Sequence, residues 1–142
     1  MQRYVVDASA FIEMRRNRQL RHLTRLVRQD LVLIPVYVLK KLEKARSCRD
    51  WLRSHGSLVS TGLMGREHEV YYQLIVQHGS WSSNPRLQDD DIMGITIAYC
   101  RKFPLVMRDR NAERVARSLG VDVLGIDEFL REIGGQPREK LI

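Results

Sequence analysis

The chain alternates between short apolar runs and stretches in which apolar residues recur every three or four positions. Four apolar, β-prone runs predict buried strands: 4–6, 31–34, 105–107 and 121–124. Helical spacing predicts helices over about 20–27, 35–52, 67–77, 89–100, 112–119 and 127–133. Because strands alternate with helices, we expect an α/β fold, a three-layer α/β/α domain with a central, mostly parallel sheet.

The 142 residues contain no linker, repeat or change of composition. We therefore expect one domain over 1–133, followed by a flexible C-terminal tail over 134–142. No apolar run approaches the ~18 residues that span a membrane. The charges near the N-terminus are in the wrong order for a secretory signal, and Cys48 and Cys100 form no CxxC motif. These features predict a cytoplasmic protein that makes no membrane contact.

The charge is strongly positive, because 24 Lys and Arg residues face 17 Asp and Glu residues, a formal net charge of +7. Such a balance favours polyanionic partners, nucleic acid above all. Arginine predominates, and its guanidinium grips phosphate with two donors. Six arginines follow the first predicted strand: Arg15, Arg16, Arg18, Arg21, Arg25 and Arg28. The alternative is a solvated helix face in a protein that is simply basic.

Carboxylates stand where the chain is expected to leave the sheet. Asp7 ends the first strand, Asp109 follows the third, and Asp89–Asp91 begin a helix. Ligands of open parallel sheets bind beyond the carboxyl ends of the strands. Buried carboxylates that converge there need a cation, and Mg²⁺ or Mn²⁺ prefers oxygen ligands. Such an ion activates water for attack on a phosphodiester, so the sequence predicts a hydrolytic metal site.

The same acids also have structural interpretations. An Asp at a helix start is more often an N-cap, which suffices for Asp89 or Asp127. Asp109 followed by Asn111 fits an Asx turn that opens a helix. No GxGxxG or P-loop motif is present, and His68 next to Glu69 forms no HExxH zinc motif. Five aromatic residues that could stack on bases receive no role from the sequence: Tyr37, Trp51, Tyr71, Tyr72 and Trp81.

Two stretches resemble PIN-domain nucleases. VVDASAFI over 5–12 resembles the family's first strand with its Asp, and LVMRDRN over 105–111 resembles the late strand that ends in an Asp. The continuation to 124 is similar to the following helix and strand, and the resemblance extends from 4 to about 129. The family's third acid has small residues five and seven positions later. Asp91 meets this spacing, and the neighbouring Asp90 is the next candidate.

The resemblance implies a metal-dependent endoribonuclease. Asp7, Asp91 and Asp109, together with Asp90, would hold Mg²⁺ or Mn²⁺. Ser9 would support Asp7, and Asn111 would assist at the rim. The proposed RNA contacts are Arg15, Arg16, Arg18, Arg108 and Arg110. The nuclease would be either a stand-alone processing enzyme or the toxin of a toxin–antitoxin pair. The length suits the toxin, which would have an antitoxin partner and would commonly be a homodimer.

The sequence departs from the family's pattern at Lys41. The family places a Glu six residues past a Pro such as Pro35, and Glu43 lies about 200° further around the helix. Glu43 could substitute only if the helix began differently, and a Lys41 that pointed into the site would compete with the cation. Met107 also replaces the family's usual Thr. A second interpretation is therefore a catalytically weakened PIN-like domain that binds RNA or a protein, and a third is an α/β protein whose acidic rim is a coincidence.

Overall fold

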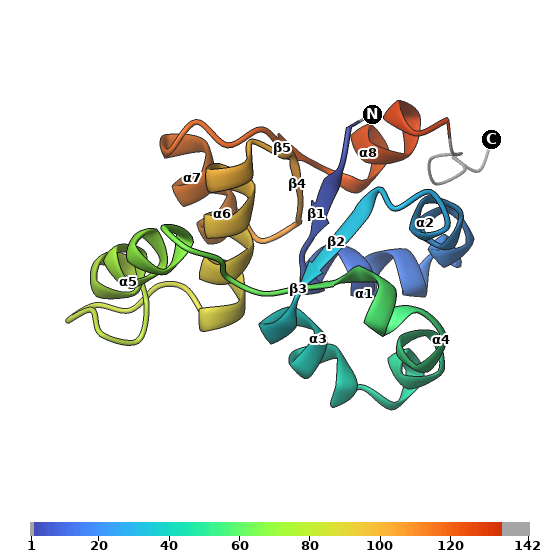
Figure 1. Ribbon diagram of the computed structural model, residues 1–142, viewed down its shortest axis with the longest axis horizontal. Coiled ribbons are helices and arrows are strands. Elements are labelled where there is room, and N and C mark those ends of the chain that lie inside the picture. Colours follow the sequence, from blue (N-terminus) through green and yellow to red (C-terminus); the bar gives the residue numbers. More distant parts are fainter. Residues whose placement is uncertain (1, 135–142) are drawn as a thin grey trace.

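Five short parallel strands form the centre of the computed structural model, which describes residues 2–134 (Figure 1). The strands are β1 (Tyr4–Val6), β2 (Val32–Pro35), β3 (Ser60–Thr61), β4 (Leu105–Val106) and β5 (Val123–Leu124). Their order in the sheet is β3-β2-β1-β4-β5. Tyr4 pairs with Val32, and Val5 with Leu105. The predicted α/β fold is confirmed, and every strand pair is parallel.

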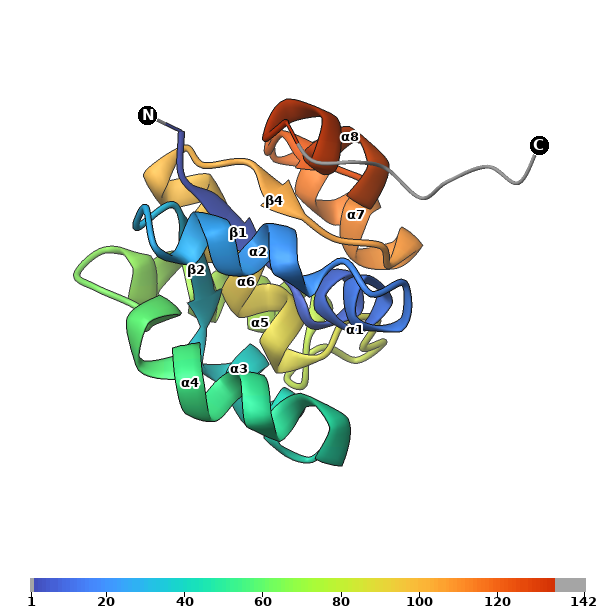
Figure 2. The ribbon, with the colours of Figure 1, turned by 90° about the vertical axis from the view of Figure 1, so that its right-hand side faces the viewer.

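Helices cover both faces of this sheet. They are α1 (Ala8–Arg16), α2 (Leu20–Val27), α3 (Val36–Glu43), the 3₁₀ helix η1 (Arg46–Cys48), α4 (Arg49–Val59), α5 (Glu67–His78), α6 (Asp89–Arg101), α7 (Arg110–Ser118) and α8 (Ile126–Glu132). Successive side chains of a strand point to opposite faces, so Val6 and Ile34 pack with α1–α4 and α8, while Val5 and Leu33 pack with α5–α7. Figures 1 and 2 show these helical layers on opposite sides of the strands, which confirms the three-layer arrangement.

Several local expectations differ from the structure. The helix expected from Pro35 onward stops at Glu43, whose carbonyl accepts a hydrogen bond from Arg49 Nε at 2.9 Å, and η1 then leads into α4. The short strand β3 and the helix α1 have no counterpart in the predicted elements. Helix α8 begins after Gly125, so Asp127 lies in its first turn instead of at its cap. The tail expected over 134–142 lies outside the described residues, apart from Gly134.

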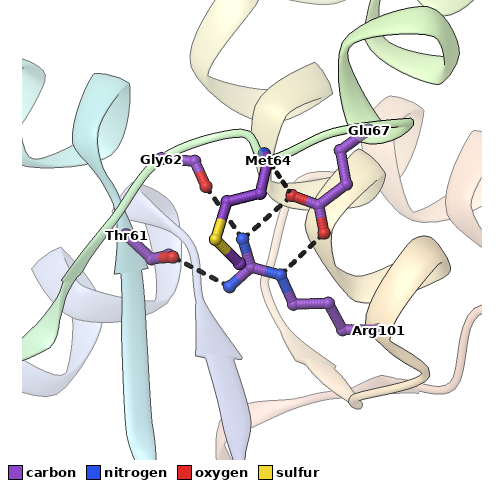
Figure 3. A network of polar contacts seen from close by, with 5 residues as sticks. All are labelled: Thr61, Gly62, Met64, Glu67 and Arg101. Carbon is purple, nitrogen blue, oxygen red and sulfur yellow. Dashed lines mark hydrogen bonds and ion pairs between the residues drawn. The ribbon is translucent and has the colours of Figure 1, made fainter.

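An arginine and a glutamate connect α5, α6 and the segment after β3 (Figure 3). Arg101 donates to both carboxylate oxygens of Glu67, at 2.8 and 2.9 Å, and also to Thr61 Oγ1 and the Gly62 carbonyl, each at 2.8 Å. The backbone N–H of Met64 donates to Glu67 at 2.8 Å. Both charged side chains are largely buried and fully paired, so this network fixes the position of α6 relative to β3.

The direction of the chain across the sheet reverses between β1 and β4. The chain runs from β1 outward to β2 and β3, then returns to the other side of β1 to form β4 and β5. Such a switch point leaves a crevice at the carboxyl ends of the two central strands, where ligands of parallel sheets bind. The N–H of Asp7 donates to the carbonyl of Val106 at 3.0 Å, so the two strand ends are joined directly.

Over the described residues, none of the helices has the length and apolar character that a membrane crossing needs.

Candidate metal centre

Asp7 lies at the carboxyl end of β1 and is 1% exposed. It occupies the N-cap position of α1, but its side chain does not cap that helix. Oδ2 accepts a hydrogen bond from the hydroxyl of Ser9 at 3.3 Å. Oδ1 is buried and has no hydrogen-bond partner in the part of the chain that the structure describes. This carboxylate therefore has an oxygen available to a ligand.

The first turn of α6 supplies two more carboxylates. Asp90 and Asp91 are buried, whereas Asp89 is exposed. Gln88, and not Asp89, occupies the N-cap position, and its N–H donates to Asp91 Oδ2 at 3.2 Å. Asp7, Asp90 and Asp91 each offer an oxygen, and these oxygens lie within 4.8 Å of one another. The fold thus brings together acids that are more than eighty positions apart in the sequence.

Burial and repulsion by neighbouring carboxylates raise the pKa values of Asp7 and Asp91. Burial, followed by the charge of Asp91, raises the pKa of Asp7 well above its ordinary value of 3.8. Burial, followed by the charge of Asp90, raises the pKa of Asp91 from 3.8 to about 6. Desolvation and neighbouring like charge both favour the neutral form of a carboxyl. The protein therefore stores electrostatic repulsion here, which a cation would relieve.

Lys41 reaches this cluster from α3. Its Nζ lies 3.5 Å from Oδ2 of Asp90 and donates a hydrogen bond to Gln88 Oε1 at 2.6 Å. Oδ2 of Asp90 is buried and has no hydrogen-bond partner among the residues that the structure covers. The side chain of Lys41 does face the acids, so the register of α3 that the sequence indicated is the observed one.

A cavity bordered by Asp109 and Ser9 adjoins the acidic cluster. It has a volume of about 320 Å³ and is lined by Ala8, Ser9, Ile12, Lys41, Arg86, Gln88, Asp91 and Asp109. Asp109 is exposed and caps α7, because its Oδ1 accepts from the N–H of Ala112 at 3.0 Å. Its charge nevertheless contributes to the raised pKa of Asp91. Asp109 therefore opens α7, as the Asx-turn interpretation predicted, and also lies at the rim of the cavity.

Ser9 links the ends of the two central strands. Its hydroxyl donates to Asp7 and accepts from the backbone N–H of Arg108 at 3.0 Å. Arg108 also forms an ion pair with Glu13 of α1. These contacts orient the carboxylate of Asp7.

The other predicted site residues are not among those that line this cavity. Glu43 lines a different cavity, with Leu52 and Gly56, so it does not join Lys41 at the cluster. Asn111 and Arg110 are exposed in the first turn of α7. Arg15 is half-buried near the end of α1, and Arg16 and Arg18 are exposed. Sequence reasoning missed Arg86 and Gln88, and the only available signal was the position of Gln88 directly before the acidic run.

The donor set fits a hard divalent cation. Three carboxylates lie within reach of one another, and two of them have buried oxygens that accept no hydrogen bond from the described residues, which matches the oxygen ligands of Mg²⁺ and Mn²⁺. The described residues that approach the cluster include one competing charge, the ammonium of Lys41. The centre is therefore suited to an ion, with Lys41 opposing its entry.

Comparisons with known proteins place this geometry in a known fold. No protein-family model matches the chain, and no curated protein matches it. The crystal structure of PAE2754 from Pyrobaculum aerophilum is similar over 94% of this chain and 97% of that one, with a TM-score of 0.58 and 17% identity. A PilT N-terminus (PIN) domain protein, SSO1118 from Sulfolobus solfataricus P2, is similar over 97% and 98%, with a TM-score of 0.55 and 14% identity.

The chain has the PIN-domain fold. The fold that VVDASAFI and LVMRDRN predicted is thereby confirmed. The buried acids lie at the carboxyl edge of the sheet of this fold. The likeness concerns the backbone, so the chemistry of the centre rests on the residues described above.

Proposed function

We propose that the protein is a metal-dependent endoribonuclease. The observation that carries this proposal is the convergence of Asp7, Asp90 and Asp91 at the switch point of the sheet, with buried oxygens that accept no hydrogen bond from the described residues. Repulsion between buried carboxylates lowers the stability of the fold. Its presence therefore indicates a functional site. The PIN fold supports a nuclease-like role for these acids.

Each polar residue at the centre has a distinct role in this proposal. Asp7, Asp90 and Asp91 hold Mg²⁺ or Mn²⁺, and Ser9 orients Asp7. Asp109 borders the cavity on the side of β4 and can accept a proton from the attacking water. When bound, the ion polarises the phosphodiester and lowers the pKa of water. Asn111, exposed in the first turn of α7, assists at the rim.

The substrate is proposed to be RNA. The net charge of +7 attracts a polyanion, and the arginines at 15, 16, 18, 108 and 110 are the proposed backbone contacts. Cys48 and Cys100 are both free thiols, which suits a reducing compartment such as the cytoplasm. The toxin role, with an antitoxin partner and a homodimer, belongs to the same proposal and is tested by sedimentation with and without the product of a neighbouring small gene.

Cleavage of labelled single-stranded RNA tests the activity directly. The wild-type protein is incubated with Mn²⁺, Mg²⁺ or EDTA, beside Asp7→Asn and the control Asp50→Asn, which changes an exposed carboxylate far along the chain. We expect metal-dependent cuts that disappear in Asp7→Asn and persist in Asp50→Asn. Cuts that survive EDTA or Asp7→Asn contradict the proposal, because they would come from another site or from a contaminant.

The contact between Lys41 and Asp90 favours a second candidate, a PIN-like domain that binds RNA or a protein without cutting. The two candidates differ in metal binding. An intact centre raises the melting temperature when Mn²⁺ is added, because a ligand that binds only the folded state stabilises it. No shift at millimolar Mn²⁺, together with RNA binding, would favour the second candidate.

A further inference from the structure

A row of four aromatic rings extends from the loop after α5 to α3. Trp81 stacks on Tyr72 with ring centroids 5.8 Å apart and planes 6° apart. Tyr72 contacts Tyr71 at 5.9 Å, and Tyr71 contacts Tyr37 at 6.2 Å, both edge to face. We call Tyr37, Tyr71, Tyr72 and Trp81 the aromatic row. Because each ring touches the next, the side chains hold one another in place.

Three members of the aromatic row present their rings to solvent. Trp81 is 65% exposed, Tyr72 is 50% exposed and Tyr37 is 37% exposed, whereas Tyr71 is buried beneath them. Scattered single apolar residues at a surface need no explanation, but rings that are stacked and contiguous form a patch. The buried Tyr71 anchors this patch to the core, so its outer rings are presented in a fixed arrangement.

Lysines border the end of the row that lies nearest the metal centre. Nζ of Lys40 lies 5.6 Å from the ring centroid of Tyr37. Lys40, Lys41 and Lys44 line one side of a cavity of about 450 Å³ together with Tyr37, Gln88, Asp89 and Asp90. The three ammonium groups outnumber the two carboxylates there, so this surface favours an anion.

This cavity adjoins the cavity of the metal centre. Lys41 and Gln88 line both, and the hydrogen bond between them marks the boundary. Asp90 lies on one side of that boundary and Asp91 on the other. A series of neighbouring side chains therefore leads from Trp81 and Tyr72, across the buried Tyr71 to Tyr37, and on through the lysines to the acids.

We propose that the aromatic row is the binding track for the bases of a single-stranded RNA, with Lys40 and Lys44 at its phosphates. Aromatic side chains stack on any base, and cationic side chains follow the backbone, which is the combination that single-strand-binding surfaces use. In a duplex the bases stack on one another, so their faces are not accessible to these rings. The delivery of the strand to the acids rests on the proposed function, whereas the binding of the strand does not.

Binding of a fluorescently labelled, single-stranded oligoribonucleotide tests this proposal. Anisotropy is measured in EDTA, so that no cleavage occurs, with the wild type, Tyr72→Ala, Trp81→Ala and Tyr72→Phe. Loss of one stacked base weakens binding by about 5- to 150-fold, so we expect each alanine variant to raise Kd by that factor. Tyr72→Phe keeps the ring, and its Kd is expected to stay within about twofold of the wild type.

Tyr99→Ala provides the matched control. Tyr99 is also an aromatic residue, 45% exposed, but it lines a cavity at the opposite edge of the sheet, beside Pro104 and Val121. We expect its Kd to match that of the wild type. An equal loss of affinity in Tyr99→Ala and Trp81→Ala would overturn the proposal, because exposed rings in general would then be responsible.

An abasic oligonucleotide separates stacking from charge. If the row stacks on bases, the wild type binds the abasic strand at least as weakly as Trp81→Ala binds the normal one, and Trp81→Ala weakens binding of the normal strand more than binding of the abasic strand. If removing the bases leaves the wild-type Kd unchanged, the proposal fails. Duplex RNA that binds as tightly as the single strand would overturn it as well.

The outcomes keep this proposal distinct from the proposed function. Metal-dependent cleavage by the wild type, with unchanged RNA affinity in Tyr72→Ala and Trp81→Ala, retains the nuclease and rejects the track. Ring-dependent binding without any cleavage retains the track and rejects the nuclease. Sedimentation of the same variants tests whether a second copy of the chain binds the aromatic row instead. The second copy is the occupant if the wild type is a dimer that Trp81→Ala converts to monomers, with no change in RNA affinity.

Discussion

The ammonium group of Lys41 lies 3.5 Å from Oδ2 of Asp90, at the boundary between the cavity that Asp90 lines and the cavity that Asp91 lines. A lysine thus places a positive charge beside carboxylates whose repulsion a metal ion would otherwise relieve. Lys41 is also held by Gln88, the residue that begins α6. The affinity of the centre for metal therefore depends on a competition between a covalently attached cation and a free one.

Removal of the ammonium is expected to strengthen metal binding. Lys41→Met leaves the stem of the side chain but removes the charge beside Asp90, and at such distances the repulsion of a cation amounts to about 1–2 kcal/mol, or roughly tenfold in affinity. We expect Mn²⁺ to bind about tenfold more tightly, as measured by calorimetry. Lys40→Met removes the same charge from the neighbouring position and serves as the control. Equal metal affinity in wild type and Lys41→Met would show that Lys41 does not compete.

Asp7→Asn is expected to stabilise the metal-free protein. The variant removes a charge that is buried, repelled by Asp90 and Asp91, and unpaired at Oδ1 within the described residues. We expect the free energy of unfolding in EDTA to rise by about 1–2 kcal/mol, measured with urea. The same variant should lose the stabilisation that Mn²⁺ gives to the wild type. A destabilised Asp7→Asn would mean that the carboxylate holds the fold together.

The stability of the metal-free protein is expected to fall as the pH rises from about 4 to about 6. Burial raises the pKa of Asp91 to about 6, so in this window the folded protein retains a proton that the unfolded chain has released. The raised pKa of Asp7 acts in the same direction. Because Arg101 lowers the pKa of Glu67, which acts in the opposite direction, the test is the difference between wild type and Asp91→Asn. Parallel pH profiles of the melting temperature for these two proteins would contradict this expectation.

Arg101→Met is expected to be strongly destabilising. It removes four hydrogen bonds to Glu67, Thr61 and Gly62, and it leaves the carboxylate of Glu67 buried without its counter-charge. Breaking a buried pair in this way costs about 3 kcal/mol or more, which urea unfolding would detect. Arg53→Met, whose partner Asp50 is exposed, should change stability by less than about 0.5 kcal/mol. Similar losses of stability in both variants would show that the network of Arg101 and Glu67 in Figure 3 stabilises the fold no more than an exposed ion pair does.

RNA binding is expected to weaken steeply between about 50 and 200 mM salt, because neutralised phosphates release counterions. Arg16→Gln and Arg18→Gln should each make the logarithmic salt slope shallower by about 0.7 if the arginine contacts a phosphate of a single strand. Arg53→Gln, on α4, is the control. If the RNA affinity of the wild type does not change with salt, the arginines do not contact RNA and form a solvated helix face.

Local patterning in the sequence accounts for much of the fold. The buried strands β1, β2 and β4 are short continuous apolar runs, because both faces of a parallel sheet are covered by helices. The position of Asp7 directly after such a run was enough to place it at the edge where ligands bind. By contrast, Ser60–Thr61 carries no apolar run, because β3 is a two-residue edge strand, and the sequence does not reveal it.

The sequence by itself thus determined the layers, the parallel sheet and the edge at which the acids gather. The family's spacing favoured Asp91 and then Asp90, but only the tertiary structure decided that both are buried while Asp89 faces solvent. It also decided that Lys41 reaches Asp90, and that rings from α3, α5 and the following loop form one row. The physical reason is that apolar periodicity is local, whereas the direction of a polar side chain depends on the packing of helices that are distant in the sequence.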